Sequence, residues 1–331
     1  MRAVPGVDIL IVSLGSTSGL RTSDDELAAS IRRAGSTVAV ARAAEQPRVR
    51  TFAYTDWRWA RAARAAARAG IAAHDPRAIV YSTTTAALMW PRPGAIRYDA
   101  PAAATRPGRH GLWQRPRERA RLSEAPLLIA TSQGTIDETP RPHAPAIVLP
   151  IAVEPSGLGE PWALRDIAAI TYAADPHKKG LDRVLSAWAR ARREGETLVV
   201  AGLDADRMPA APDGVVAAGR LDRDAYRALL LRSKLFVTAP RREDHGVAQL
   251  EALADGCLLV TTPSPGPYAA LPIARQLDAR LVTDELSAAI RGALDEPAPR
   301  YVERSIPLLE PFTRASVDRV VQAELLPRLL G

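Results

Sequence analysis

The sequence predicts an α/β protein built from two doubly wound domains, each with a parallel sheet covered by helices. Three observations lead to this fold class. Short apolar runs alternate with longer amphipathic segments from the start of the chain, as in repeated βα units. The chain has 331 residues, which suits two domains of about 150 to 170 residues. Hydrophobic residues make up 47% of it, enough for two sizeable cores.

The first half of the chain is expected to form one such domain. Strands are indicated where short apolar runs are bounded by turn residues, and helices where apolar residues recur every three or four positions. The expected strands are 7–13, 37–41, 78–82, 95–98, 127–131 and a run within 146–153. Helices are expected over 24–33 and 57–70, and 101–121 is expected to be a mobile loop that runs into a basic helix.

The second half repeats the same alternation. A strand is expected over 235–240. Helices are expected to begin at Val247 and within 311–330. We therefore expect an N-terminal domain over residues 1–155, a second domain over 156–311, and a C-terminal helical segment over 312–331.

Two glutamates bracket an expected helix start in the second domain. Seven residues separate Glu243 from Glu251, and Gly246 lies between them. The free N–H groups at such a helix start, here those of Gly246 and Val247, form an anion site. A nucleotide diphosphate bound there would present a ribose and a donor sugar. Ionised carboxylates can accept hydrogen bonds from the hydroxyl groups of both. The alternative is a solvated loop glutamate plus a helix glutamate paired with an arginine.

Lys178 and Lys179 lie near another expected helix start and are two of only three lysines in the chain. The helix dipole disfavours cations at that end, so their placement indicates an anion nearby. The alternative is a pair of exposed lysines with no ligand.

Residues 167–271 resemble the C-terminal half of retaining glycosyltransferases of the GT-B fold, in particular the large family 4, which carries a Glu-x7-Glu motif. The matching segments occur in order: 168–173, the Lys-Gly helix start within 177–185, the strand ending at Gly202, 215–221, 224–234 and 254–266. The resemblance implies a GT-B fold, with two Rossmann-like domains facing an interdomain cleft, a boundary near 152–162, and a last helix that crosses back to the N-terminal domain.

The resemblance also implies roles for single residues of the second domain. Glu243 would position the donor sugar near its anomeric centre, and Glu251 would hold the ribose. Lys179, with Lys178 beside it, would bind the diphosphate, and Arg220 belongs to the strand and turn that face the base. In the family a Gly-Arg pair precedes this lysine, but here those positions are Ala173 and Ala174. Lys178 is the expected substitute, although an ammonium does not reproduce the bidentate fork of arginine.

In the N-terminal domain, the resemblance makes 14–20 the glycine-containing loop that faces donor phosphate and acceptor, through Gly15 and Ser16. The alternative is an ordinary βα turn. A family histidine-aspartate pair corresponds here to Tyr98 and Asp99. Asp99 is expected to contact acceptor or sugar, the alternative being a turn or capping aspartate. His110 is the candidate acceptor residue from the loop, the alternative being an exposed, inert histidine.

Charge is unevenly distributed along the chain. Residues 1–155 hold 21 arginines against 13 acidic residues, whereas 156–331 are close to neutral. A basic first domain suggests an anionic acceptor, lipid-linked or otherwise, and peripheral membrane contact. The helix over 57–70, with two tryptophans and a stripe of arginines, can lie on an anionic membrane. The alternative is the solvated outer face of a helix that covers the sheet.

The sequence analysis thus predicts a metal-independent, retaining hexosyltransferase that uses a UDP- or GDP-sugar, without a cofactor. No Cys/His cluster has metal-ligand spacing, and the single cysteine, Cys257, is expected in the core. Neither a signal peptide nor a membrane span is indicated, so a cytoplasmic location is expected, either free or at the inner face of the membrane. One alternative is a degenerate GT-B module that binds without turnover. Nucleic-acid binding is a weaker one, because no such motif accompanies the arginines.

Overall fold

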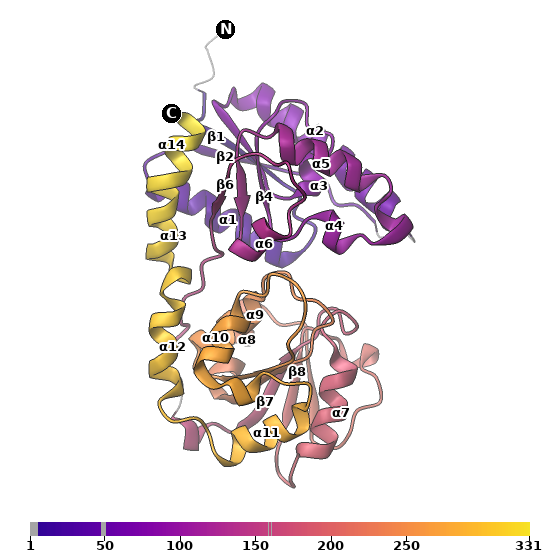
Figure 1. Cartoon of the computed structure of the whole chain (residues 1–331), viewed down its shortest axis with the longest axis vertical. Helices are drawn as coiled ribbons and strands as arrows, with labels where there is room; N and C mark the ends of the chain where they lie inside the picture. The colour runs from indigo at the N-terminus through magenta and orange to yellow at the C-terminus, as the bar shows by residue number, and fades with distance from the viewer. Residues whose placement is uncertain (1–5, 48–50, 158, 160) are drawn as a thin grey trace. The chain divides into compact units, whose positions relative to one another are not determined.

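The computed structural model describes residues 6–47, 51–157, 159 and 161–331, which divide into two compact units (Figure 1). The first unit comprises the described residues up to Ala152 together with Arg314–Gly331, and the second comprises those within Val153–Thr313. Each unit has its own parallel sheet and its own core. The predicted α/β fold with two parallel sheets is confirmed.

The first unit is built on a six-stranded sheet of order β2-β1-β3-β4-β5-β6, in which all recorded pairings are parallel. Its strands are β1 (Ile9–Ser13), β2 (Val38–Arg42), β3 (Ala78–Tyr81), β4 (Ala95–Tyr98), β5 (Leu128–Ala130) and β6 (Ala146–Val148). The central strands carry apolar side chains on both faces of the sheet, because helices cover both faces, as parallel sheets require.

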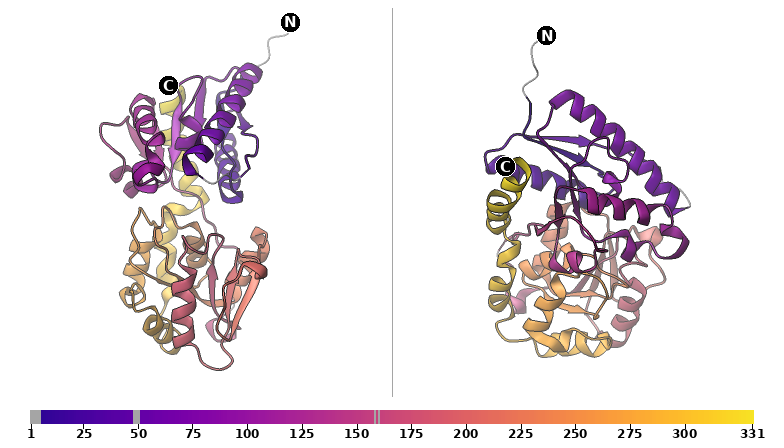
Figure 2. Two further views of the ribbon diagram at one scale, coloured as in Figure 1. Left: turned by 90° about the vertical axis from the view of Figure 1, so that its right-hand side faces the viewer. Right: turned by 45° about the horizontal axis from the view of Figure 1, so that its top comes forward.

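Two groups of helices cover this sheet (Figure 2). One face packs on α2 (Phe52–His74), α3 (Thr84–Ala87) and α5 (Gln114–Glu124). The other packs on α1 (Ser18–Arg33) and on the C-terminal run of α13 (Arg314–Val320), η6 (Val321–Leu325) and α14 (Leu326–Leu330). An ion pair of 2.7 Å between Arg33 and Asp318 joins the C-terminal run to α1. The last helix therefore belongs to the core of the first unit.

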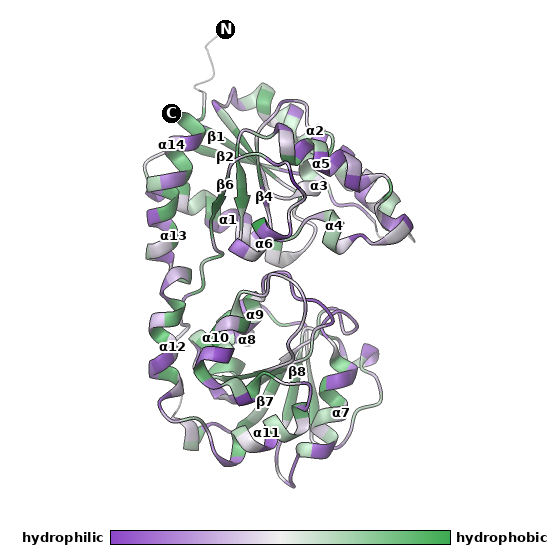
Figure 3. Cartoon of the chain, viewed as in Figure 1, coloured by the Kyte–Doolittle hydropathy of each residue, from purple (hydrophilic) through white to green (hydrophobic). Residues whose placement is uncertain are grey.

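The second unit is built on a five-stranded sheet of order β11-β10-β7-β8-β9, again with parallel pairings. Its strands are β7 (Ile167–Tyr172), β8 (Leu198–Ala201), β9 (Val215–Gly219), β10 (Ser233–Thr238) and β11 (Leu258–Thr261). Its helices of seven or more residues are α7 (Leu181–Ala191), α8 (Arg223–Arg232), α9 (Val247–Ala254), α10 (Ala270–Asp278), α11 (Leu286–Asp295) and α12 (Tyr301–Leu309). Green colouring in Figure 3 follows the strands into the interior, where Trp188 and Phe236 are the largest fully buried side chains of this unit.

Residues 101–121 do not form the mobile loop that the sequence analysis expected. They contain α4 (Ala102–Thr105), the 3-10 turn η1 (Gly108–Gly111) and the first part of α5. The segment is ordered by two buried acids: Glu118 Oε1 accepts the Ala102 N–H at 2.5 Å, and Asp56 of α2 pairs with Arg106 at 3.1 Å. Polar groups buried with such partners hold a segment that its Pro- and Gly-rich composition alone would leave open.

None of the described helices is both long enough and apolar enough to cross a lipid bilayer.

The buried carboxyl group of Glu118 predicts how stability depends on pH. Burial raises the pKa of Glu118 from 4.5 to about 7, although hydrogen bonds from Thr84 and Ala102 oppose the shift. The folded chain then binds this proton more tightly than the unfolded chain, so its contribution to stability falls as pH rises from 4.5 to about 7. Glu118→Gln stays neutral at every pH. Its melting temperature, measured from pH 5 to 8, should therefore not show this part of the decrease. A variant that is less stable than the parent at pH 8 would contradict this origin of the pH dependence.

Candidate functional site

The carboxyl ends of the parallel strands in the second unit meet at one edge of its sheet, where ligands bind in doubly wound folds. The loops that follow β7 and β10 lie next to each other there, since β7 and β10 are neighbouring strands. Lys179, from the first loop, pairs with Glu243, from the second, with 2.7 Å between Nζ and Oε2. Glu243 is buried, with 4% of its surface exposed. A carboxylate in such a position requires a cation or strong donors beside it.

The close approach of these two loops depends on Gly180. Its φ is 64°, in the left-handed region, and a Cβ atom there would lie 1.9 Å from the carbonyl oxygen of Ala239. No side chain fits at this point, so glycine is required for the loop after β7 to rest on the end of β10. The conformation also sets the start of α7 and brings the preceding Lys179 over the loop of Glu243.

Helix α9 begins directly after Gly246, which has φ 88° and lies against the ring of Tyr268. Among the described residues no side chain caps this helix start. The first N–H groups of a helix lack intrahelical acceptors and favour negative charge. Gly246 and Val247 therefore present amides at this helix start, and Gln249 in the first turn donates to Glu243 at 2.9 Å, the same carboxylate that Lys179 contacts. The structure thus brings Lys179, Glu243 and the start of α9, all predicted to bind the donor substrate, together at one place.

Lys178 reaches a different carboxylate. Its Nζ lies 2.7 Å from Oδ2 of Asp244, and Arg242 holds the other oxygen of the same carboxyl at 2.8 Å. Burial alone would raise the pKa of Asp244, but Lys178 and Arg242 outweigh it, and the pKa is lowered. The side chain of Lys178 is 45% exposed. A second cation thus lies on the same loop pair as Lys179, although the arginine of the Gly-Arg pair is replaced by the exposed Ala174.

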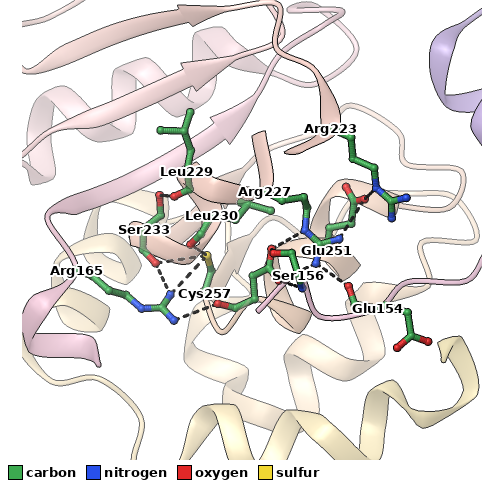
Figure 4. A network of polar contacts seen from close by, with 11 residues as sticks. Glu154, Ser156, Arg165, Arg223, Arg227, Leu229, Leu230, Ser233, Glu251 and Cys257 are labelled. Carbon is green, nitrogen blue, oxygen red and sulfur yellow. Dashed lines mark hydrogen bonds and ion pairs between the residues drawn. The ribbon is translucent and has the colours of Figure 1, made fainter. Parts of the chain in front are cut away.

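Glu251 projects from α9 toward α8, as Figure 4 shows. Its Oε1 lies 3.4 Å from Arg227 and 3.7 Å from Arg223, which are one turn apart on α8. Burial raises the pKa of Glu251, while the two arginines oppose the shift. This arrangement was the sequence-level alternative for Glu251, a helix glutamate paired with an arginine. It is also compatible with ribose binding, because Arg223 is half exposed and its contact at 3.7 Å is weak.

Arg227 is the centre of the network drawn in Figure 4. It donates to both oxygens of Asp255 at 2.5 and 2.6 Å, and to the carbonyl oxygen of Glu154 at 2.7 Å. Asp255 also accepts the backbone N–H and the hydroxyl of Ser156. The Asp255 carboxyl is fully buried, and a bidentate arginine is the geometry that compensates such burial best. The network fixes α8, the end of α9 and residues 154–156 to one another.

The sequence analysis did not identify this network or its counterpart in the first unit. There Arg97 of β4, almost fully buried, pairs with Asp24 of α1 at 3.4 Å and donates to Ser23 at 2.6 Å. Ser13 at the end of β1 donates to the same Asp24 at 2.6 Å. The available signal for the second-unit network was the spacing of four residues that separates Arg223 from Arg227 and Glu251 from Asp255.

Arg220 follows β9 at the same edge of the second sheet, but it lies on the surface and pairs with Asp204 at 3.1 Å. Among the described residues, no group of three or more His, Cys, Asp and Glu side chains could hold a metal ion. Cys257 is buried, as expected, and burial raises the pKa of its thiol to about 12.

The candidate residues of the first unit lie at the carboxyl ends of its strands or beyond. Gly15, with φ 58°, and the exposed Ser16 follow β1, and Thr17 then caps α1 at Ser18, six residues before the expected helix start. Asp99 follows β4 with its side chain exposed, and its carbonyl oxygen accepts the Thr135 hydroxyl at 2.8 Å. His110 is exposed on η1, a segment that packs against α2.

Comparisons with known proteins bear on the fold of the chain and on its second unit. Residues 166–296 match the model of the family described as glycosyl transferases group 1. A sucrose-phosphate synthase from Thermosynechococcus elongatus superimposes with a TM-score of 0.74 at 14% identity, over 98% of both chains. HepE from Anabaena, solved with UDP and glucose, gives a TM-score of 0.68 at 14% identity, over 98% of this chain and 100% of that one. No curated protein sequence matches the chain.

A third similar structure is WaaG, a glycosyltransferase involved in lipopolysaccharide biosynthesis, with a TM-score of 0.66 at 15% identity over 98% of this chain and 97% of that one. At these identities the structural matches establish the fold. The fold is GT-B, with two Rossmann-like domains, and the residues that match the group 1 glycosyltransferase model lie in the second unit. The resemblance seen in the sequence is confirmed at this level.

The buried Arg227–Asp255 pair predicts a large loss of stability when one partner is removed. Arg227→Met should lower the free energy of unfolding by about 3–5 kcal/mol, because the Asp255 carboxylate is left buried without its cation. Arg232→Met is a matched control, since Arg232 ends the same helix and pairs with Asp166 in solvent. Urea denaturation of both variants measures the difference. Equal effects of the two substitutions would show that burial does not decide the strength of the pair.

Proposed function

We propose that this protein is a retaining glycosyltransferase of the family 4 type that moves a hexosyl unit from a nucleotide diphosphate sugar to an acceptor hydroxyl without a metal ion. The group 1 glycosyltransferase match over residues 166–296 supports the reaction class. The observation that carries the proposal is the convergence of Lys179, Glu243 and the uncapped start of α9 at the carboxyl edge of the second sheet. The proposed donor is a UDP- or GDP-sugar.

In the proposed reaction, negative charge develops on the departing diphosphate. Lys179 and the amides of Gly246 and Val247 would stabilise that charge, because they are fixed before the reaction begins. Lys178 would contribute a second positive charge in place of the missing arginine. Glu243 would hold the donor sugar near its anomeric carbon, and the acceptor would attack from the face that the leaving group departs from.

The diphosphate of a nucleotide sugar can compete for Lys179, because the present partner of Lys179 is a carboxylate of the same site. When a diphosphate pairs with Lys179, the ammonium is shared between the diphosphate and Glu243. The Glu243 carboxylate can then accept hydrogen bonds from the sugar hydroxyls. The ribose would be held by Glu251, whose position Arg227 fixes. Arg220 is assigned to the base side of the site, at the end of β9.

The first unit is assigned to the acceptor. Asp99 would contact acceptor or donor sugar, Gly15 and Ser16 would form the loop after β1 that meets the donor phosphate, and His110 would contact the acceptor. The excess of arginine in residues 1–155 supports an anionic or lipid-linked acceptor. A cytoplasmic location, free or at the inner face of a membrane, is part of the same proposal.

A degenerate GT-B module that binds without turnover is the second candidate. Two substitutions favour it: Ala173-Ala174 replaces the phosphate-binding Gly-Arg pair, and Tyr98, whose hydroxyl is bonded to Thr139 at 2.7 Å inside the core, replaces the histidine. Calorimetry with nucleotide sugars, followed by an assay for released nucleotide over a panel of acceptors, separates the two. Binding with no release over the whole panel would favour the module.

Glu243→Gln should lower the rate of transfer by about 100-fold or more, because the sugar loses a charged acceptor at the reacting centre. The substitution keeps the size of the side chain, and its amide oxygen can still accept from the partly exposed Lys179, so its melting temperature should fall by less than that of Arg227→Met. Glu303→Gln, at an exposed position on α12, is the control and should leave the rate unchanged. Unchanged turnover in Glu243→Gln would remove Glu243 from the site.

A thermal-shift series with UDP, GDP, ADP and inorganic pyrophosphate tests the donor site without needing an acceptor. One nucleoside diphosphate should raise the melting temperature more than the others and so identify the base. Glu251→Gln should reduce the shift from that nucleotide but not the shift from pyrophosphate, because Glu251 is assigned to the ribose. Loss of both shifts together would indicate damage to the fold instead.

A further inference from the structure

The start of α2 and the segment formed by η1 and the start of α5 make one surface of the first unit. We name it the aromatic–arginine surface. α2 packs against η1, and the Asp56–Arg106 ion pair joins the second turn of α2 to the residues just before η1. Its members are Tyr54, Trp57, Arg58 and Arg61 from α2, Arg109 from η1, Leu112 and Trp113 between η1 and α5, and Arg115 and Arg117 from α5.

None of the residues that make up this surface is an acid that offsets its positive charge. Residues 52–74 and 106–121 contain ten arginines and two acids, Asp56 and Glu118. Both acids are buried and are used internally, by Arg106 and by the Ala102 N–H respectively. Glu124, at the end of α5, pairs with Arg121, so the residues that make up the aromatic–arginine surface include arginines and no acid. An anionic partner is the chemistry that such a face fits.

Exposed apolar groups lie among these arginines. Tyr54 is 48% exposed and Leu112 is 65% exposed, and they are the two exposed large hydrophobic residues described in the first unit. The rings of Trp57 and Trp113 are half-buried beside them. Isolated exposed apolar residues are common, but both here coincide with the cationic face. The combination of apolar tips and cations is typical of surfaces that lie at a bilayer interface.

The arginines and the rings are also stacked on each other. The guanidinium carbon of Arg61 lies 4.8 Å from the ring centre of Trp57, that of Arg117 lies 5.0 Å from Trp113, and that of Arg58 lies 5.8 Å from Tyr54. Stacking holds each cation against the face of its ring. In a membrane, aromatic rings of this kind sit at headgroup level, where the guanidinium groups would meet lipid phosphates.

We propose that the aromatic–arginine surface docks the first unit on an anionic lipid bilayer, with Tyr54 and Leu112 inserted among the headgroups and Arg61 and Arg117 on the phosphates. A nucleic acid fits the surface less well. The rings that would stack on its bases are covered by guanidinium groups, and the aliphatic side chain of Leu112 provides neither stacking nor charge. Docking does not depend on the proposed transfer reaction, since none of the proposed donor residues belongs to the surface.

Vesicle flotation of the full chain, without nucleotide, tests this surface. The protein should float with vesicles of phosphatidylglycerol and phosphatidylcholine, but not with phosphatidylcholine alone. Raising the salt concentration should weaken binding because ions screen the arginines. Arg61→Glu/Arg117→Glu should lower the apparent affinity by about tenfold or more. Tyr54→Ser/Leu112→Ser should also weaken binding, and the remaining binding should be more sensitive to salt.

The control is Arg183→Glu/Arg275→Glu, which reverses two exposed arginines of the second unit. It changes the net charge equally and should leave flotation unchanged. All variants should keep the nucleotide-induced thermal shift of the parent, so failure of docking can be distinguished from failure of the donor site. Equal binding to neutral vesicles, an equal loss in the control, or preferential binding to an oligonucleotide over anionic vesicles would overturn the proposal.

Discussion

The ion pair between Lys179 and Glu243 is the interaction on which the rest of the candidate donor site depends. Glu243 is almost completely buried, and a buried carboxylate persists only with a cation and hydrogen-bond donors beside it. Lys179 and Gln249 supply these from two different elements, the loop after β7 and the first turn of α9. The pair therefore requires that both loops come close, and the glycines at 180 and 246 are the positions that allow this.

A second buried pair fixes the far end of α9. Arg227 and Asp255 join α8, the end of α9 and residues 154–156, and Glu251 takes its position from the same arginine. One glutamate is thus held at the beginning of α9 by a lysine and the other near its end by arginines. Each carboxylate already has the kind of charged surroundings that a nucleotide sugar would share, so binding would exchange partners within the site instead of building it anew.

The fold could be predicted from the sequence because parallel sheets covered on both faces leave a clear pattern of short apolar runs. The run 235–240 corresponds to β10, and the helix after Gly246 begins where the glycine indicated. The basic helix within 101–121 is present as α5, but the loop before it is folded into α4 and η1. The sequence does not indicate this because the order comes from Glu118 and Asp56, whose partners lie 16 and 50 residues away in the chain. The predicted start of α1 was too late in the chain, because Thr17 caps the helix before its apolar residues begin. The Arg227–Asp255 and Arg97–Asp24 networks were missed for a related reason, since buried ion pairs join residues that no local periodicity relates.

A crystal structure of the full chain with the nucleotide sugar that stabilises it most is the decisive test of the candidate donor site. We expect a diphosphate within hydrogen-bond distance of the Lys179 Nζ and of the Gly246 and Val247 amides, with sugar hydroxyls on Glu243 and ribose hydroxyls on Glu251. A nucleotide bound elsewhere, with the Lys179–Glu243 pair unchanged, would contradict it.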